Sequence, residues 1–236
     1  MVSNRNSAIS LAIGAALVAL LSLLPASARA ADDARAAALF PLCGQCHGAA
    51  GAGNQMYLAP AIAGLPEWYV FAQLQNFYTG QRGKHPDDLA GLRMYPMAKT
   101  FQGDRAESDM QALAAYVAKL PPPPTPATLV GGDPERGARS YQVCTACHGP
   151  AANGNEALRA PPLHQQHDWY LLSSLQRYKS GVRASDPRNT NAQVMQGMSG
   201  TLVDEQAMKD VIAYIRTLGG AQSAAAPTPE PAIEVE

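Results

Sequence analysis

The sequence contains 236 residues, with 18 basic and 19 acidic side chains and a formal net charge of −1. This balance excludes the strongly basic surface with which nucleic-acid-binding proteins neutralise phosphates. The length corresponds to one or two domains of ordinary size.

Residues 1–30 have the pattern of a secretory signal peptide. Arg5 gives a short positive start, residues 8–24 form an apolar run, and Ala28-Arg29-Ala30 supplies an A-x-A cleavage site. We therefore expect export to the periplasm and cleavage after Ala30. The alternative is an uncleaved membrane anchor, because the apolar run approaches the ~20 residues that span a bilayer. No later segment is long and apolar enough for a membrane span.

The next predicted element is a short helix from Asp33 to Leu42, which leads into Cys43-Gly44-Gln45-Cys46-His47. C-x-x-C-H is the attachment sequence of c-type haem. Its cysteines, Cys43 and Cys46, form thioethers with the haem vinyl groups, and His47 binds the iron as the proximal ligand. A second copy, Cys144-Thr145-Ala146-Cys147-His148, contains the remaining two of the four cysteines. The sequence therefore predicts two covalently bound haem c groups.

Other interpretations of the cysteines are weaker. A structural zinc site can use two C-x-x-C pairs, but it requires neither a histidine after each pair nor so long a separation. Disulfides or a thioredoxin-like centre are disfavoured because no βαβ pattern surrounds either pair. Export also agrees with haem attachment, which in bacteria takes place outside the cytoplasmic membrane.

Two further helices are predicted in the first half. One runs from Glu67 to Thr79, with apolar residues at three- and four-residue spacing, and ends at Gly80. The other runs from Glu107 to Leu120. The stretch between them contains Met94 and Met97, is rich in glycine and proline, and is expected to be a loop.

The second half repeats the first at an offset of 101 residues, until a three-residue deletion shifts the frame after Thr201. Asp133-Pro134-Glu135 has the pattern of a helix start, and further helices are expected at 168–180 and 204–218. Residues 121–132 include a proline run that predicts a stiff polyproline II linker. Residues 219–236 are rich in alanine, proline and glutamate and are expected to form a disordered tail.

The duplication therefore predicts an all-α protein with two tandem domains, an N-terminal one at 31–120 and a C-terminal one at 133–218. Each domain is too small to have much core of its own. We expect a few helices to wrap around one covalently attached haem in each.

A haem that only transfers electrons keeps both axial positions filled, and methionine thioether is the usual partner of histidine. Each half offers two candidates in an M-x-x-M frame, namely Met94 and Met97, then Met195 and Met198. The order of C-x-x-C-H, a proline, a W/Y-bearing helix ending in G-x-R, a methionine segment and a final A-x-Y helix resembles the diheme class I cytochromes c of the c-four type. The resemblance covers nearly all of residues 33–218, and departs from the family in the polar 81–92 segment and in the tail.

The resemblance implies which methionines are ligands. In relatives of this type the ligand lies seven residues before an apolar residue that opens the last helical stretch. Counting back from Phe101 and Leu202 implies Met94 and Met195. The second methionine of each pair then packs beside the porphyrin. The remaining candidates, Met56, Met110 and Met208, are expected in the core or at the surface.

The resemblance also implies residues around the ligands. The carbonyl groups of Pro60 and Pro161 are expected to accept the Nδ1 proton of the proximal histidines. For six further side chains the sequence leaves two roles open. The helix aromatics either contact a haem propionate or pack in the core: Trp68, Tyr69, Trp169 and Tyr170. The arginines Arg82 and Arg183 either pair with a propionate or lie in solvent. Three histidines have no histidine at the matching position of the other half, and they are expected at the surface: His85, His164 and His167.

His/Met ligation at both irons leaves no open position for oxygen, peroxide or nitrite, so the sequence predicts a carrier of single electrons between respiratory-chain components. The resemblance implies a membrane quinol-oxidising complex or dehydrogenase as donor and a terminal oxidase or reductase as acceptor. The alternatives are the cytochrome subunit of a periplasmic dehydrogenase complex, a diheme peroxidase, or a fragment anchored to a membrane oxidase.

Overall fold

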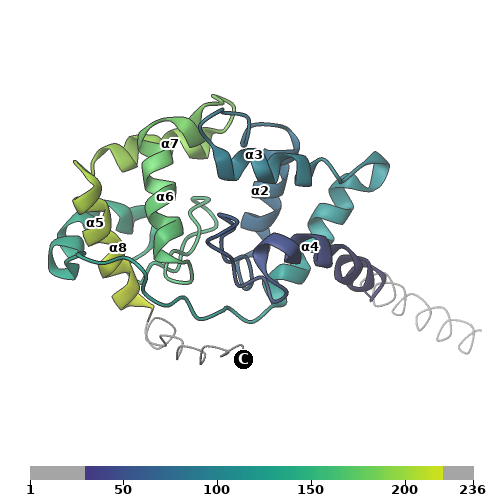
Figure 1. Cartoon of the computed structure of the whole chain (residues 1–236), viewed down its shortest axis with the longest axis horizontal. Coiled ribbons are helices and arrows are strands. Elements are labelled where there is room, and N and C mark those ends of the chain that lie inside the picture. The colour runs from purple at the N-terminus through teal and green to yellow at the C-terminus, as the bar shows by residue number, and fades with distance from the viewer. Residues whose placement is uncertain (1–29, 220–236) are drawn as a thin grey trace, which may run out of the picture.

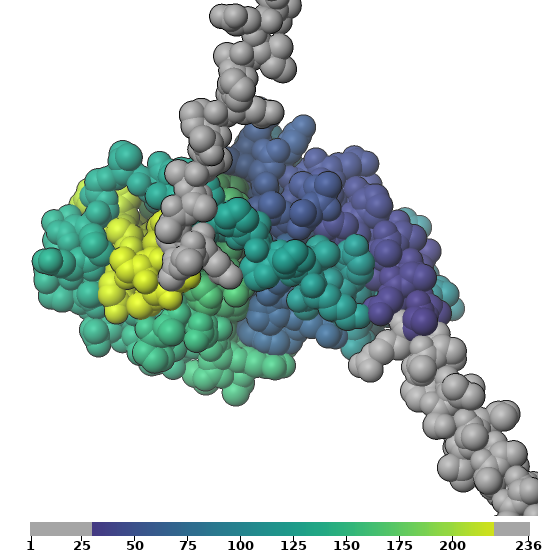
Figure 2. Space-filling view, turned by 90° about the horizontal axis from the view of Figure 1, so that it is seen from below, coloured from purple at the N-terminus to yellow at the C-terminus, as the bar shows by residue number. Residues whose placement is uncertain are grey.

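The structure is a computed structural model that describes residues 30–219. Within them the chain forms two helical halves that lie side by side (Figure 1). Figure 2 shows the N-terminal half, in purple and blue, in contact with the C-terminal half, in green and yellow. Outside the helices, the described residues form only isolated bridges, Asn54 with Ala59 and Asn155 with Ala160. Residues 1–29 of the signal peptide predicted over 1–30, and residues 220–236 of the tail predicted over 219–236, lie outside the described residues.

The N-terminal half begins with a helix over residues 30–47, which continues through the first C-x-x-C-H motif. It is followed by α2 (Glu67–Tyr78), α3 (Leu89–Ala98) and α4 (Ala106–Lys119), with a 3-10 turn, η1 (Gly103–Arg105), before α4. The helices predicted at 67–79 and 107–120 are thus confirmed to within a residue at each end. The first helix is longer than predicted, and the haem-attachment cysteines belong to it.

The C-terminal half repeats this order. It contains α5 (Pro134–His148), α6 (Asp168–Lys179), the 3-10 turn η2 (Val182–Ala184), α7 (Thr190–Gly200) and α8 (Glu205–Leu218). The predicted start of α5 is confirmed in detail, because the side chain of Asp133 accepts from the backbone N–H groups of Glu135 and Arg136.

The prediction of a loop around the methionines is wrong. Met94 and Met97 lie on α3, and their counterparts lie on α7. Each helix has a side-chain N-cap, Asp88 for α3 and Asn189 for α7. Pro96 inside α3 and the glycines of α7 have low helix propensity, so neither helix could be predicted from local sequence. Packing against α2 and α6 compensates for this low propensity.

Each half has its own apolar core, so the expectation that each domain has little core of its own is wrong. The core of the N-terminal half is centred on α4, with Leu113 and Val117 almost fully buried, and α8 contributes Val211 and Ile212 in the C-terminal half. Gly137 allows α5 to cross α8 closely, since a Cβ there would lie 1.9 Å from the carbonyl oxygen of Asp210. Among residues 30–219 no helix has the length and apolarity needed to span a membrane.

The segment between the halves is held on the surface of the molecule. It has no helix or strand from 121 to 130, and Pro123 and Thr125 are buried. The carboxylate of Asp168 accepts from the backbone N–H groups of Thr128 and Leu129 at 2.7 and 2.9 Å. These contacts fix the chain just after the proline run to the first residue of α6.

Candidate haem-binding sites

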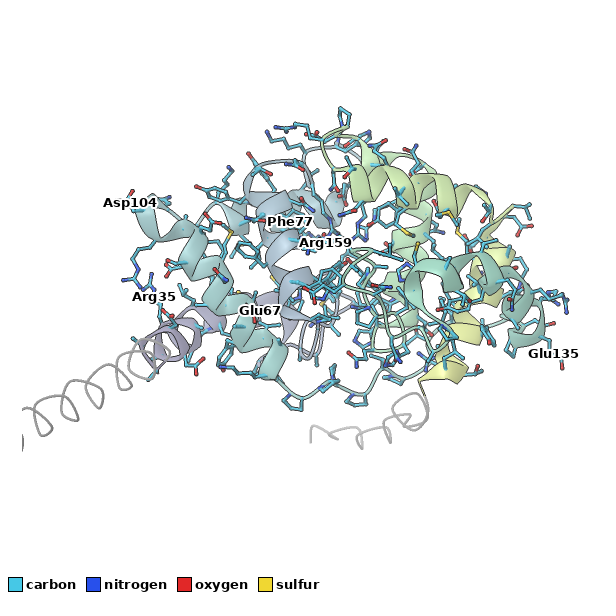
Figure 3. All side chains as sticks on the ribbon, turned by 180° about the vertical axis from the view of Figure 1, so that it is seen from behind. Arg35, Glu67, Phe77, Asp104, Glu135 and Arg159 are labelled. Atoms are coloured by element: carbon cyan, nitrogen blue, oxygen red, sulfur yellow. The ribbon has the colours of Figure 1, made fainter. Side chains whose placement is uncertain are left out.

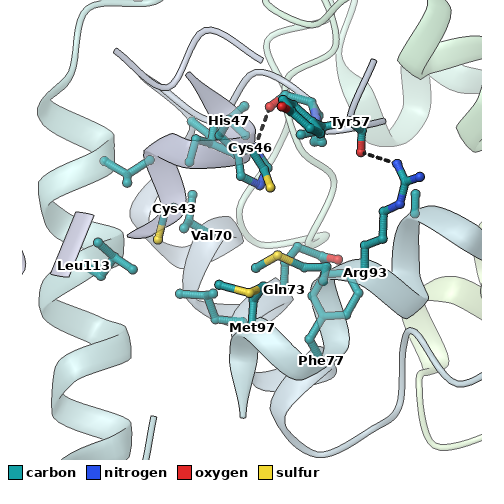
Figure 4. Close-up of a pocket in the computed structure, with 18 of the residues that line it drawn as sticks. Cys43, Cys46, His47, Tyr57, Val70, Gln73, Phe77, Arg93, Met97 and Leu113 are labelled. Carbon is teal, nitrogen blue, oxygen red and sulfur yellow. Dashed lines mark hydrogen bonds between the residues drawn. The ribbon is translucent and has the colours of Figure 1, made fainter. Parts of the chain in front are cut away.

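The N-terminal half contains a cavity with the first C-x-x-C-H motif on one side and α3 on the other. It is lined by Cys43, Cys46 and His47, and by both methionines of α3. In Figure 4, Met97 lies across this cavity from His47. Thiols for covalent attachment therefore adjoin the cavity, and it has a nitrogen ligand on one side and sulfur atoms on the other.

The C-terminal half has the matching cavity. Cys144, Cys147 and His148 line it together with Met195 and Met198 of α7. Because the two cysteine pairs line different cavities, they do not form one four-cysteine zinc site.

Both proximal histidines are fixed by the proline carbonyl groups that the sequence analysis singled out. The Nδ1 atoms of His47 and His148 each lie 2.8 Å from the carbonyl oxygens of Pro60 and Pro161, respectively. An Nδ1 proton donated there leaves Nε2 as the ligand atom. Burial lowers the pKa of both imidazoles, against the opposing effect of the proline hydrogen bond. The neutral form, which binds a metal, is therefore favoured.

The other methionines are placed as expected. Met56 is 82% exposed, while Met110 and Met208 are buried in the cores of the two halves. None of the three lines either cavity.

The two cavities share a wall where the halves meet. Residues of both halves line both cavities: Leu65, Tyr69, Gln73, Gln166 and Tyr170. Gln166 joins the halves directly, since its amide group accepts from the N–H of Ala61 at 3.0 Å and donates to its carbonyl oxygen at 2.9 Å. The sequence analysis did not predict this contact. The one signal that could have pointed to Gln166 is that the repeat alignment places Leu65, an apolar residue, at the matching position.

Three arginines gather at this wall. Arg82 and Arg183 are buried, so the solvated role that the sequence left open for them is wrong. Arg82 donates to the Tyr170 hydroxyl at 3.2 Å, and its buried Nε atom has no hydrogen-bond partner within residues 30–219. Arg177 also contributes positive charge here. Among the described residues, its partner Asp88 is the one carboxylate that accepts a hydrogen bond from any of the three guanidinium groups.

The wall therefore has an excess of positive charge. Burial alone would raise the pKa of Tyr170, but Arg183 and Arg82 lower it to about 7. An orphaned guanidinium nitrogen and a surplus of buried positive charge fit the carboxylates of haem propionates, which would form charge-assisted hydrogen bonds here.

The tryptophans differ between the halves. Trp68 lines the cavity of the C-terminal half, with the Arg159 guanidinium 5.5 Å from its ring centroid. Figure 3 shows Arg159 toward the middle of the molecule, where the halves meet. Trp169 lines neither cavity and instead stacks on His167, with ring centroids 5.6 Å apart.

The unmatched histidines have local partners. His85 lies beside Asp87, and His164 bonds the carbonyl oxygen of Ala152 at 3.1 Å. His167 is not the surface residue that was expected, because its Nε2 bonds the carbonyl oxygen of Ala52 in the other half at 2.7 Å.

Comparison with known proteins agrees with this geometry. The family model for cytochrome c matches residues 34–121 and again residues 134–219. The chain belongs to the cytochrome c family. It is 34% identical to the thiosulfate dehydrogenase electron acceptor of Thiomonas intermedia, over 73% of this chain and 76% of that protein. It is 31% identical to cytochrome c4 of Azotobacter vinelandii, over 74% and 86% of the two chains.

Solved structures show the same fold. Cytochrome c4 of Acidithiobacillus ferrooxidans matches with a TM-score of 0.61 over 75% of this chain and 99% of its own, at 24% identity. A thiosulfate dehydrogenase from Marichromatium purpuratum matches with a TM-score of 0.59 at 29% identity, over 79% of this chain but only 39% of its own.

The chain is thus a diheme class I cytochrome c of the c4 type, all-α, with two cytochrome c domains and two covalently bound haems. It carries electrons. When bound, each haem supplies a one-electron iron couple. The protein supplies the thiols of the two motifs, places a carbonyl acceptor beside Nδ1 of each proximal imidazole, and surrounds each site mainly with apolar side chains.

Proposed function

We propose that Met94 and Met195 are the sixth ligands, opposite His47 and His148. Both methionines line their cavities from helices that occupy equivalent places in the two halves. Their position seven residues before Phe101 and Leu202 supports them over Met97 and Met198. A thioether ligand at both irons raises the reduction potentials, which suits a carrier late in an electron-transfer chain.

The same proposal covers the architecture and the compartment. The two domains span 31–120 and 133–218 around a linker at 121–132, with a signal peptide cleaved after Ala30 and a mature protein in the periplasm. The ranges matched by the cytochrome c family support the limits of the two domains.

The proposed role is transfer of single electrons between respiratory-chain proteins, with no catalytic reaction of its own. The donor is a membrane quinol-oxidising complex or a dehydrogenase, and the acceptor is a terminal oxidase or reductase. The observation that carries this role is the wall common to both cavities, since two haems on either side of it can exchange electrons internally. A diheme peroxidase, by contrast, needs one iron that loses its distal ligand, and each cavity here has two methionines available.

A second candidate is narrower. Two relatives, at 34% and 30% identity, are electron acceptors of thiosulfate dehydrogenase. The chain is then the acceptor that a periplasmic dehydrogenase of this kind reduces.

Rapid-mixing kinetics tests these alternatives. The oxidised diheme protein is mixed with reduced quinol-oxidising complex, or with thiosulfate dehydrogenase and thiosulfate, and haem reduction is followed optically. Fast reduction by the first donor supports the respiratory carrier, and reduction by the second alone supports the dehydrogenase acceptor. Turnover of peroxide by the protein itself would contradict both.

A further inference from the structure

A buried ion pair joins α6 of the C-terminal half to the start of α3 in the N-terminal half. Arg177 donates from Nη1 to Oδ1 of Asp88 at 3.0 Å, and their side chains are 13% and 1% exposed. The Nε atom of Arg177 also donates to the carbonyl oxygen of Ser173, one turn earlier on α6. The guanidinium group is therefore oriented by its own helix. Removing one member of such a buried pair leaves an uncompensated charge, which is strongly destabilising.

The same carboxylate caps α3. Oδ1 of Asp88 accepts from the backbone N–H of Gly91 at 3.0 Å, in the first turn of the helix that carries Met94. The C-terminal half therefore bonds, through Arg177, to the residue that fixes where α3 begins. Met94 packs against the apolar core of the N-terminal half and lines its cavity.

Within the described residues, the methionine helix of the C-terminal half has no such ion pair at its cap. The cap of α7 is the neutral Asn189, which accepts from the N–H of Ala192. The repeat alignment places Asn76 opposite Arg177, Asn189 opposite Asp88 and Ala192 opposite Gly91.

Gly91 belongs to the same arrangement. A Cβ at this position would lie 2.1 Å from Oδ2 of Asp88, so the glycine makes room for the paired carboxylate. Asp88 and Gly91 belong to the first half and Arg177 to the second, and none of the three residue types occurs at the matching position of the other half.

We infer that Arg177 is a positioning residue for the N-terminal methionine ligand: through Asp88, the C-terminal half holds α3 and the Met94 sulfur in place, whereas within residues 30–219 no matching ion pair from the N-terminal half holds α7 and Met195. This inference rests on the proposed ligation by Met94 and Met195. It makes the methionine ligation of one haem dependent on the contact between the halves, so a movement at the interface changes the ligation of the N-terminal iron and not that of the C-terminal iron.

The test uses two backgrounds of the full diheme protein. Met195→His removes the sulfur ligand from the C-terminal iron, so that the remaining sulfur-to-iron charge-transfer band reports the N-terminal iron alone. Met94→His provides the converse background. Asp88→Asn is then added to each, because asparagine caps a helix as well as aspartate does but leaves Arg177 without its counter-charge.

At a fixed urea concentration below unfolding, we expect Asp88→Asn to increase about tenfold the fraction of N-terminal iron that has lost its sulfur band. The Met94→His background should show no change. Arg177→Asn, which removes the other partner, should give the same selective loss, and it replaces Asp88→Asn if that variant does not fold. Arg188→Asn, which breaks an exposed ion pair of the C-terminal half, is the control and should alter neither band.

An equal loss in both backgrounds would overturn the inference in favour of general destabilisation, and no loss in either would show that the pair does not position the ligand. A third result concerns the proposed ligation itself: if Met195→His leaves the full band of the parent protein, Met195 is not a ligand. That outcome overturns the proposed function at this site and the inference with it.

Discussion

Two glycines set the direction of the proximal histidines. Gly53 and Gly154 have φ angles of +89° and +81°, in the left-handed region. A Cβ on Gly53 would lie 2.6 Å from the backbone nitrogen of Ala61 and 2.8 Å from the carbonyl carbon of Pro60. Only glycine therefore lets the chain bring the Pro60 carbonyl group against the Nδ1 atom of His47.

Gly53→Ala should move the Pro60 carbonyl group away from His47. A weaker hydrogen bond makes the imidazole a poorer electron donor to the iron, so the reduction potential of one haem should rise while the other stays constant. Spectroelectrochemical titration measures both potentials. Gly103→Ala is the control, since its φ is also positive but its Cβ would meet nothing within 4 Å. It should cost about 1 kcal/mol of stability and leave both potentials unchanged.

Substitution of single methionines tests the ligand assignment. Met94→Leu should abolish about half of the sulfur-to-iron charge-transfer band, because one of two irons loses its thioether. Met97→Leu preserves apolar volume one turn away and should retain the whole band. The reverse pattern in near-infrared spectra would assign Met97 as the ligand.

At the scale of helices, the sequence predicted those with clear apolar spacing and conventional ends. Helices α2, α4, α6 and α8 have apolar residues at three- and four-residue spacing. Asp133 and Asp204 are the N-cap residues that mark the starts of α5 and α8. The methionine helices escaped prediction because Pro96 and several glycines weaken them locally. Their stability comes from contacts with α2 and α6, which no local pattern contains.

The pair that joins α5 to α8 makes stability depend on acid pH. Arg136 donates to Asp210, and this hydrogen bond lowers the pKa of Asp210 to about 2, from an ordinary value of 3.8. The stabilisation is complete above the ordinary value and is lost as the pH falls through the lowered one. The free energy of unfolding should therefore decrease between about pH 4 and pH 2. Urea titrations of Asp210→Asn should show a smaller decrease than those of the parent, and equal slopes would contradict this account.

At the scale of the whole molecule, the duplication predicted two domains and two haems but not how the domains meet. The bridging residues Gln166 and His167 have no equivalents in the first half, which has Leu65 and Pro66 at those positions. Their partners are backbone groups of Ala61 and Ala52, which carry no sequence signal. The shared wall between the cavities follows from these contacts, so only the structure reveals it.

Gln166→Leu gives the second half the residue type that the first half has at the matching position, Leu65. It leaves the buried N–H and carbonyl groups of Ala61 without their partner, which should cost about 1–3 kcal/mol and separate the unfolding of the two halves. Urea unfolding, followed by the absorbance of the haems, measures this separation as two transitions in place of one. Gln176→Leu removes an exposed amide that donates to Glu205, and it should leave a single transition at the original midpoint. A single unchanged transition for Gln166→Leu would contradict the role of this bridge.

The central claim is that both irons are held by a histidine and a methionine and serve only to carry electrons. A pyridine haemochrome assay, combined with optical and near-infrared spectra of the oxidised and reduced protein, tests it most directly. The account predicts two haems per chain, both low-spin, with a sulfur-to-iron charge-transfer band of the strength expected for two sites. A high-spin component, or a band from one iron only, would contradict it and would identify an iron open to substrate.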